Sequence, residues 1–100
     1  MFMMASIQSN IKYSGKTDKE FYNAAIQTEP QADLEIWKTR ELARLVLAHG
    51  EYKGEQVRCN IVTSMVDGNT TITAESDGLD EKALTHILSR LQKELLALLV

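Results

Sequence analysis

The stretch LVLAHGEYKGEQVRC, residues 45–59, holds side chains that could do chemistry: a histidine, two glutamates, a tyrosine and the only cysteine of the chain. Cys59 beside His49 would combine a thiol nucleophile with a general base, and the same two side chains could also bind a metal ion. Either chemistry requires the two side chains to approach within bonding distance. The backbone predicted for this stretch therefore decides whether it can be an active site.

The stretch is predicted to fold as a β-hairpin that turns at Lys53 and Gly54. In that register His49 pairs with Arg58, and Cys59 lies across from the residue before His49. Because successive side chains of a strand point to opposite faces of the sheet, His49 and Cys59 are separated by the sheet itself. We therefore expect Cys59 to be a buried structural residue and not a nucleophile.

No other arrangement in the sequence has the spacing of a catalytic or metal site. His49 and His86 are far apart, and neither an HxxxH nor a CxxC motif is present. His86 falls near the polar boundary of the last predicted helix, where a solvated or capping role is expected. Glycine-rich phosphate loops are also absent from the sequence. We therefore expect a protein that is not an enzyme and that has no catalytic residues, no metal and no cofactor.

The composition limits the class of protein further. A chain of 100 residues with 44% hydrophobic and 25% charged residues is typical of a single globular domain, residues 1–100. The net charge of -3 argues against nucleic acid as the main partner, since such binding requires clustered basic residues. One cysteine cannot form an internal disulfide, which favours a cytoplasmic protein. The longest apolar run, LLALLV, is far shorter than the roughly 20 residues of a membrane span.

The first part of the chain is predicted to form a strand and then a helix. Residues 5–15, ASIQSNIKYSG, alternate between apolar and polar side chains up to a glycine, which is typical of a half-buried strand. Thr17 and Glu20 have the spacing of a capping box, in which each side chain accepts a hydrogen bond from the other residue's backbone. The helix is expected to run from Asp18 to about residue 28, because Pro30 opposes its continuation.

Residues 32–49 allow two interpretations. The segment is rich in helix-forming residues, and Gly50 would suit the end of a helix. On a helix, however, the apolar residues from Leu42 to position 48 would surround the whole circumference, which is rare outside a buried helix. We favour a short turn of helix that carries Trp37, followed by a strand from about Leu42 to Tyr52 that enters the hairpin.

The second half of the chain has clearer patterns. Residues 57–65 alternate strictly and predict a strand, VDGNT predicts a tight turn, and TTITAES predicts the returning strand. Asp80 is the expected N-cap of the last helix. The residues expected on its apolar stripe are Leu84, Ile87, Leu88, Leu91, Leu95 and Leu98.

Together these elements predict an α+β fold: an antiparallel sheet of about four strands, a capped N-terminal helix, and a long amphipathic C-terminal helix packed on one face. The other face of the sheet is expected to be half apolar, because it carries Leu45, Leu47 and Val62 next to His49 and Arg58. Such a face is seldom left bare. The simplest expectation is that the chain's own elements cover it, and a second copy or a ligand are the alternatives.

Two further features suggest surfaces of contact. Leu96, Leu99 and Val100 make the end of the last helix hydrophobic on nearly every side, and a symmetric dimer could bury both this tip and the sheet face. Fraying of the terminus is the simpler interpretation. The residues of the possible contact surface are Leu45, Leu47, His49, Arg58, Val62, Leu96 and Leu99.

A possible ligand patch is formed by Trp37, Arg40 and Arg44 with Lys38. An aromatic surface beside arginines could bind an anion, because a guanidinium group can hold a carboxylate or phosphate with two hydrogen bonds. The simpler interpretation is a core tryptophan edged by solvated charges.

The order of strand, capped helix, connecting segment, antiparallel meander and long closing helix resembles a shortened helix-grip (START or Bet v 1-like) arrangement. That resemblance implies a curved sheet around a C-terminal helix, with a cavity for an apolar ligand. The order is also similar to that of a small dimeric α/β subunit of a tRNA-modifying assembly. We expect a non-catalytic interaction module that forms a homodimer, and the alternative is a small apolar-ligand binder.

Overall fold

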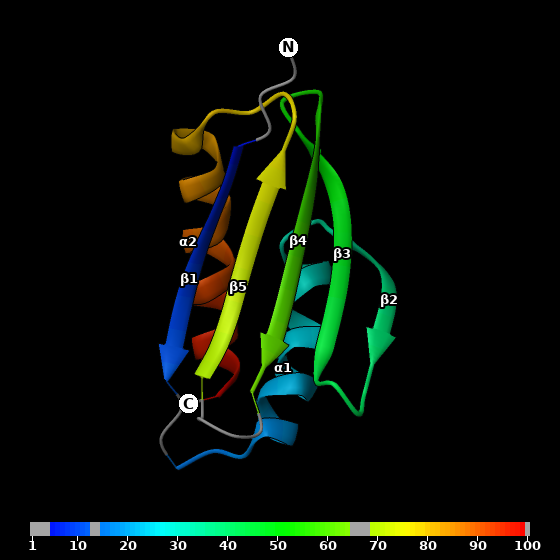
Figure 1. The fold of residues 1–100 in the computed structure, drawn as a ribbon, viewed down its shortest axis with the longest axis vertical. Helices are drawn as coiled ribbons and strands as arrows, with labels where there is room; N and C mark the ends of the chain where they lie inside the picture. Colours follow the sequence, from blue (N-terminus) through cyan, green and yellow to red (C-terminus); the bar gives the residue numbers. More distant parts are fainter. Residues whose placement is uncertain (1–4, 13–14, 65–68, 100) are drawn as a thin grey trace.

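The computed structural model describes residues 5–12, 15–64 and 69–99. It has an antiparallel sheet with two helices against it (Figure 1). The α+β class and the long C-terminal helix are as predicted, but the sheet has five strands and not about four. The elements are β1 (Ala5–Lys12), α1 (Asp18–Gln31), β2 (Glu35–Arg40), β3 (Leu45–Tyr52), β4 (Glu55–Thr63), β5 (Asn69–Ser76) and α2 (Glu81–Leu98).

The strands lie in the order β1-β5-β4-β3-β2, and every neighbouring pair is antiparallel. Strands β2 to β5 form a meander, while β1 closes the sheet beside β5 (Figure 1). The first and second strands are therefore at opposite edges, and α1 crosses behind the sheet to connect them.

The hairpin between β3 and β4 has the predicted register. His49 pairs with Arg58, and Cys59 pairs with the residue before His49. Lys53 and Gly54 have φ angles of 53° and 83°, which is the left-handed backbone that a two-residue hairpin turn requires. The predicted turn between β4 and β5 lies largely outside the described residues, but the register on either side of it is continuous from Arg58 to Thr63.

Helix α1 begins as predicted and ends later than predicted. The Thr17 hydroxyl accepts a hydrogen bond from the Glu20 amide at 3.1 Å, and the Glu20 carboxylate accepts one from the Thr17 amide at 3.4 Å. The helix continues through Pro30 to Gln31, so the expected end near residue 28 is wrong by about one turn. Pro30 is tolerated in this last turn because it removes only its own backbone hydrogen bond, while the Ala32 amide still donates to the carbonyls of residues 28 and 29.

The interpretation of residues 32–49 was right for its second part and wrong for its first. Residues 45–52 are a strand, which begins at Leu45 and not at Leu42. Residues 35–40 are also a strand, β2, and not a turn of helix. This segment pairs with the free edge of β3, and those backbone hydrogen bonds outweigh its local preference for helix. The register shifts between Ile36 and Lys38, and Trp37 lies at that irregularity.

A single hydrophobic core lies between the helices and one face of the sheet. Both helices contribute to it, and they also contact each other. The predicted stripe of α2 is buried except for Leu98, which is 37% exposed near the helix end. The fully buried core residues from the sheet are Val46, Ala48, Val57, Cys59, Ile61, Ile72 and Ala74.

The opposite face of the sheet is not covered by either helix (Figure 1). The expectation that the chain's own elements cover it is therefore wrong for the described residues. Both helices pack on the core side because that side is more apolar. It presents branched aliphatic side chains on every central strand, so packing there buries the most apolar area. Neither helix of the described chain is long and apolar enough to cross a membrane.

Candidate functional site

Cys59 and His49 do not form a site. Cys59 is completely buried on the core face, and His49 is half-buried on the other face, as predicted. Burial, followed by the charges of Glu29 and Glu75, raises the pKa of the Cys59 thiol to about 12. A thiol with so high a pKa carries almost no thiolate at neutral pH, so it is not a nucleophile. Within the described ranges, no group of three histidine, cysteine or acidic residues could hold a metal ion.

The uncovered face of the sheet carries a small apolar surface formed by Leu45, Leu47 and Val62, here called the sheet-face patch. Leu45 on β3 lies directly across from Val62 on β4, and Leu47 lies across from Asn60. Val62 is 37% exposed, while the two leucines are half-buried by their neighbours. The patch is therefore continuous over two central strands and open to solvent.

Charged groups border this patch. On one side, the Arg58 Nε atom lies 2.9 Å from the Glu75 Oε1 atom, an ion pair between β4 and the neighbouring strand β5. On the other side, the edge strand β2 places Glu35 across from His49 and Arg40 across from Leu45. The border thus has an acidic residue near one end of β2, and basic residues at its middle, where Lys38 lies across from Leu47, and at its other end.

Two further apolar side chains are exposed next to the patch. Trp37 is 56% exposed, so the interpretation of a core tryptophan is wrong. The Lys38 ammonium group lies 5.9 Å from the centre of the Trp37 ring, a cation–π contact at the sheet edge. Leu42, in the turn between β2 and β3, is 88% exposed. Both belong to the edge of the sheet that adjoins Leu47 and Leu45.

The hydrophobic tip of α2 is separate from the sheet-face patch. Leu96 is 40% exposed, and Leu99 is half-buried against the core. Because α2 lies on the helix-covered side, the tip and the patch are on opposite sides of the sheet (Figure 1). One contact surface therefore cannot include all of the residues predicted for it.

The predicted ligand patch of Trp37, Arg40 and Arg44 is not assembled. The Arg44 Nε atom lies 2.7 Å from the Asp18 Oδ2 atom. This side chain therefore points away from β2 and connects the loop between β2 and β3 to the start of α1. The hydrogen bond from Arg44 is the main reason that the pKa of Asp18 is lowered. Arg40 remains on the uncovered face, across from Leu45.

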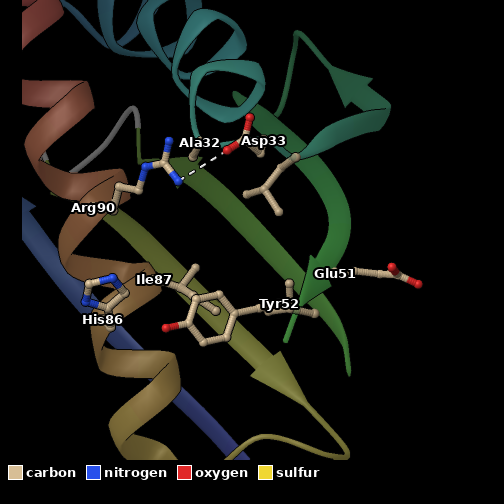
Figure 2. A pocket seen from close by; sticks show the side chains of 9 residues that line it. Ala32, Asp33, Glu51, Tyr52, His86, Ile87 and Arg90 are labelled. Carbon is tan, nitrogen blue, oxygen red and sulfur yellow. Dashed lines mark hydrogen bonds and ion pairs between the residues drawn. The ribbon is translucent and has the colours of Figure 1, made fainter. Parts of the chain in front are cut away.

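The structure adds a feature that the sequence did not indicate: a cleft of about 120 Å³ between the end of α1, β3, β4 and α2 (Figure 2). Its lining residues lie far apart in the sequence, so no local pattern could have indicated it. The lining residues are Ala32, Asp33, Leu34, Glu51, Tyr52, Val57, His86, Ile87 and Arg90.

Polar groups occupy two ends of this cleft (Figure 2). At one end, the Arg90 Nη2 atom donates a hydrogen bond of 3.0 Å to the Gln31 carbonyl, and Nη1 lies 3.4 Å from the Asp33 carboxylate. At the other end, the rings of Tyr52 and His86 have centres 6.1 Å apart at an angle of 42°. His86 thus forms part of a cleft wall, beyond the solvated role predicted for it.

The main space between sheet and helices is filled by side chains. The helix-grip resemblance implies a ligand cavity there, but α2 packs its buried leucines directly against the core face of the sheet. The cleft lies at the edge of this core. Searches of the sequence against models of protein families and against curated proteins find no match.

Proposed function

We propose that this protein is a non-catalytic interaction module that self-associates through the uncovered face of its sheet. The observation that carries the proposal is that both helices pack on one face, which leaves Leu45, Leu47 and Val62 open on the other. Burying such a surface against a second copy removes apolar area from water, which favours association by about 25 cal/mol for each Å² of apolar area buried.

The face is large enough for an interface of standard size. The molecule extends over 42 × 23 × 23 Å, and the sheet runs along the longest dimension. A standard protein interface buries roughly 800 Å² on each partner, which is comparable to a sheet face of this length and width. The exposed edge with Trp37 and Leu42 would add aromatic and aliphatic area at the margin.

The charges at the border suggest how two copies pair. A two-fold axis that passes near Leu47, parallel to the sheet and perpendicular to its strands, would place Leu47 over its counterpart in the second copy. Leu45 would then lie over His49 of the second copy, and Glu35 would face Arg40 of the second copy. Acid meets base twice in this arrangement, because the axis generates each contact in duplicate, and Lys38, across from Leu47, lies near its own counterpart at the margin.

Sedimentation equilibrium at micromolar concentration tests the proposal. We expect twice the chain mass of 11.2 kDa for the unmodified protein. Leu47→Asp should give the monomer, since it buries a charge at the centre of the interface. Leu96→Asp is the matched control, because it places the same charge on an exposed leucine of the opposite side. A monomeric protein would refute the proposal, as would dissociation by Leu96→Asp alone.

A charge-reversal experiment tests the pairing itself. Glu35→Arg and Arg40→Glu should each weaken the homodimer roughly tenfold, because each creates like-charge contacts at two symmetry-related places. A mixture of the two variants should recover a heterodimer in which both contacts are again acid on base. If the mixture associates no better than either variant alone, the proposed arrangement is wrong.

A second candidate function is the binding of a small apolar ligand. The cleft favours it, because a concave apolar surface with a few polar groups at its rim is the usual form of a ligand site. This function is independent of self-association, since the cleft lies on the helix side of the sheet. Protein-observed NMR titration with small aromatic molecules tests it, and shifts confined to the amides of the cleft are the expected result.

A further inference from the structure

The cleft between α1, β3 and α2 has a rigid apolar floor. Leu34, Val57 and Ile87 form it, with exposed fractions of 7%, 1% and 8%. Leu34 can lie against β3 because residue 50 is a glycine: a Cβ atom there would come within 2.8 Å of the Leu34 Cδ2 atom. Side chains so closely packed do not need to rearrange to receive a ligand, which lowers the entropic cost of binding.

The volume of the cleft limits the size of the ligand. An apolar protein cavity of about 150 Å³ holds one benzene ring. The cleft measures about 120 Å³ and is open on one side, so it fits one ring or a branched chain of similar size. A lipid or a polycyclic molecule is too large for it.

The charge at the rim selects the polar group of the ligand. The Arg90 guanidinium is oriented by its hydrogen bond to the Gln31 carbonyl. Its other contact, to Asp33, is long at 3.4 Å and involves a carboxylate that is 85% exposed, so a competing carboxylate could replace it at little cost. The Glu51 side chain points away from the cleft (Figure 2). A carboxylate would pair with Arg90, whereas an ammonium group would be repelled by it.

The Tyr52 and His86 rings close the end of the cleft opposite Arg90 (Figure 2). The Lys53 ammonium group lies 5.4 Å from the centre of the Tyr52 ring, a further contact that holds this ring in place. An aromatic wall at one end of the cleft and a guanidinium group at the other suit a ligand with a ring at one end and an acid at the other.

We propose that this cleft binds a small monocarboxylate with a single ring or a short branched chain, its acid on Arg90 and its apolar body on Leu34, Val57 and Ile87. The inference rests on the second candidate function and names the chemical class of its ligand. It does not depend on self-association.

Three matched probes test the inference by NMR titration of the unmodified protein: phenylacetate, phenylacetamide and 2-phenylethylamine. They share one ring and differ in the charge of the polar group. We expect phenylacetate to shift the amides of the cleft and to bind at least tenfold more tightly than the amide or the amine. Equal binding of phenylacetate and phenylacetamide would overturn the inference that the cleft selects a carboxylate, but the cleft would still be a ligand site. No shift with any probe at millimolar concentration would also overturn the second candidate function.

A pair of variants assigns the selectivity to Arg90. Arg90→Gln should weaken phenylacetate binding at least tenfold and leave phenylacetamide binding unchanged. Lys93→Gln removes the same charge from an exposed position of the same helix and should change neither. An equal loss in both variants would show a general charge effect and would contradict the proposed contact. The comparison of probes on the unmodified protein needs no variant, so the inference is tested even if Arg90→Gln does not fold.

Discussion

Glu29 and Cys59 share one buried layer between α1 and the sheet. Burial raises the pKa of the Cys59 thiol, and the negative charge that Glu29 acquires at alkaline pH raises it further. Burial also raises the pKa of Glu29 itself from 4.5 to about 9. Its two carboxyl oxygens have no hydrogen-bond partner among the described residues. An ionised carboxylate in such a place is costly, so Glu29 is neutral in the folded protein at pH 7.

Glu29→Gln should make the protein less sensitive to alkaline pH. Because the pKa of Glu29 is raised by folding, its contribution to the free energy of unfolding is fully present below about pH 4.5 and is lost as the pH rises toward 9. The loss is roughly 1.4 kcal/mol per pH unit within that window. Glutamine has no such titration, so the variant should gain stability relative to the unmodified protein as the pH rises. Urea unfolding at pH 5, 7 and 8.5 measures this.

Glu41→Gln is the control for that experiment, since Glu41 is exposed in the turn between β2 and β3. It should follow the pH dependence of the unmodified protein. A constant offset between Glu29→Gln and the unmodified protein at all three pH values would contradict a buried neutral carboxyl group.

Cys59 should not react with thiol reagents in the folded protein. Its pKa of about 12 leaves about one thiolate in ten thousand at pH 8, and its side chain is inaccessible. We expect iodoacetamide to label the cysteine in 6 M guanidinium chloride, and only very slowly without denaturant, as measured by mass spectrometry. Rapid labelling of the folded protein would show that Cys59 is not in the core.

The turn between β3 and β4 should respond to changes in backbone preference, and Lys53→Asn also removes the cation–π contact of Lys53 with Tyr52. Gly54→Ala should destabilise the protein by about 1–2 kcal/mol, because an alanine is strained in left-handed backbone. A Cβ atom at Gly54 would meet nothing within 4 Å, so no steric clash contributes. Lys53→Asn should instead stabilise it by a few tenths of a kcal/mol, since asparagine favours the positive φ angle of that position. Urea unfolding of both variants checks the opposite signs, and a shared sign would refute the turn type.

Two leucine-to-alanine substitutions compare the core with the surface. Leu91 is completely buried on α2, and Leu91→Ala should cost about 2–5 kcal/mol because it removes buried methyl groups and leaves a cavity. Leu42 is 88% exposed, and Leu42→Ala should change the stability by less than about 0.5 kcal/mol. Thermal unfolding measures both. A large effect at Leu42 in the monomeric Leu47→Asp background would mean that the turn between β2 and β3 is packed.

The sequence by itself determined the features that depend on neighbouring residues. The register of the β3–β4 hairpin follows from the turn at Lys53 and Gly54 and from strict alternation, because a two-residue turn leaves only one pairing. The starts of both helices also follow from neighbouring residues, because the N-cap residues Thr17 and Asp80 can be recognised in the sequence. The separation of His49 from Cys59 was a consequence of that register.

Only the tertiary structure decided what depends on distant surfaces. Strand β2 exists because the edge of β3 supplies hydrogen bonds to a segment whose own residues do not specify a strand, and Trp37 is exposed as a result. The position of α1 beside α2 left the second face of the sheet bare. The cleft brings Tyr52 of β3 together with His86 and Arg90 of α2. Such arrangements of distant residues depend on which apolar surfaces the helices and strands bury together. The packing of the whole chain, and not any local segment, determines this.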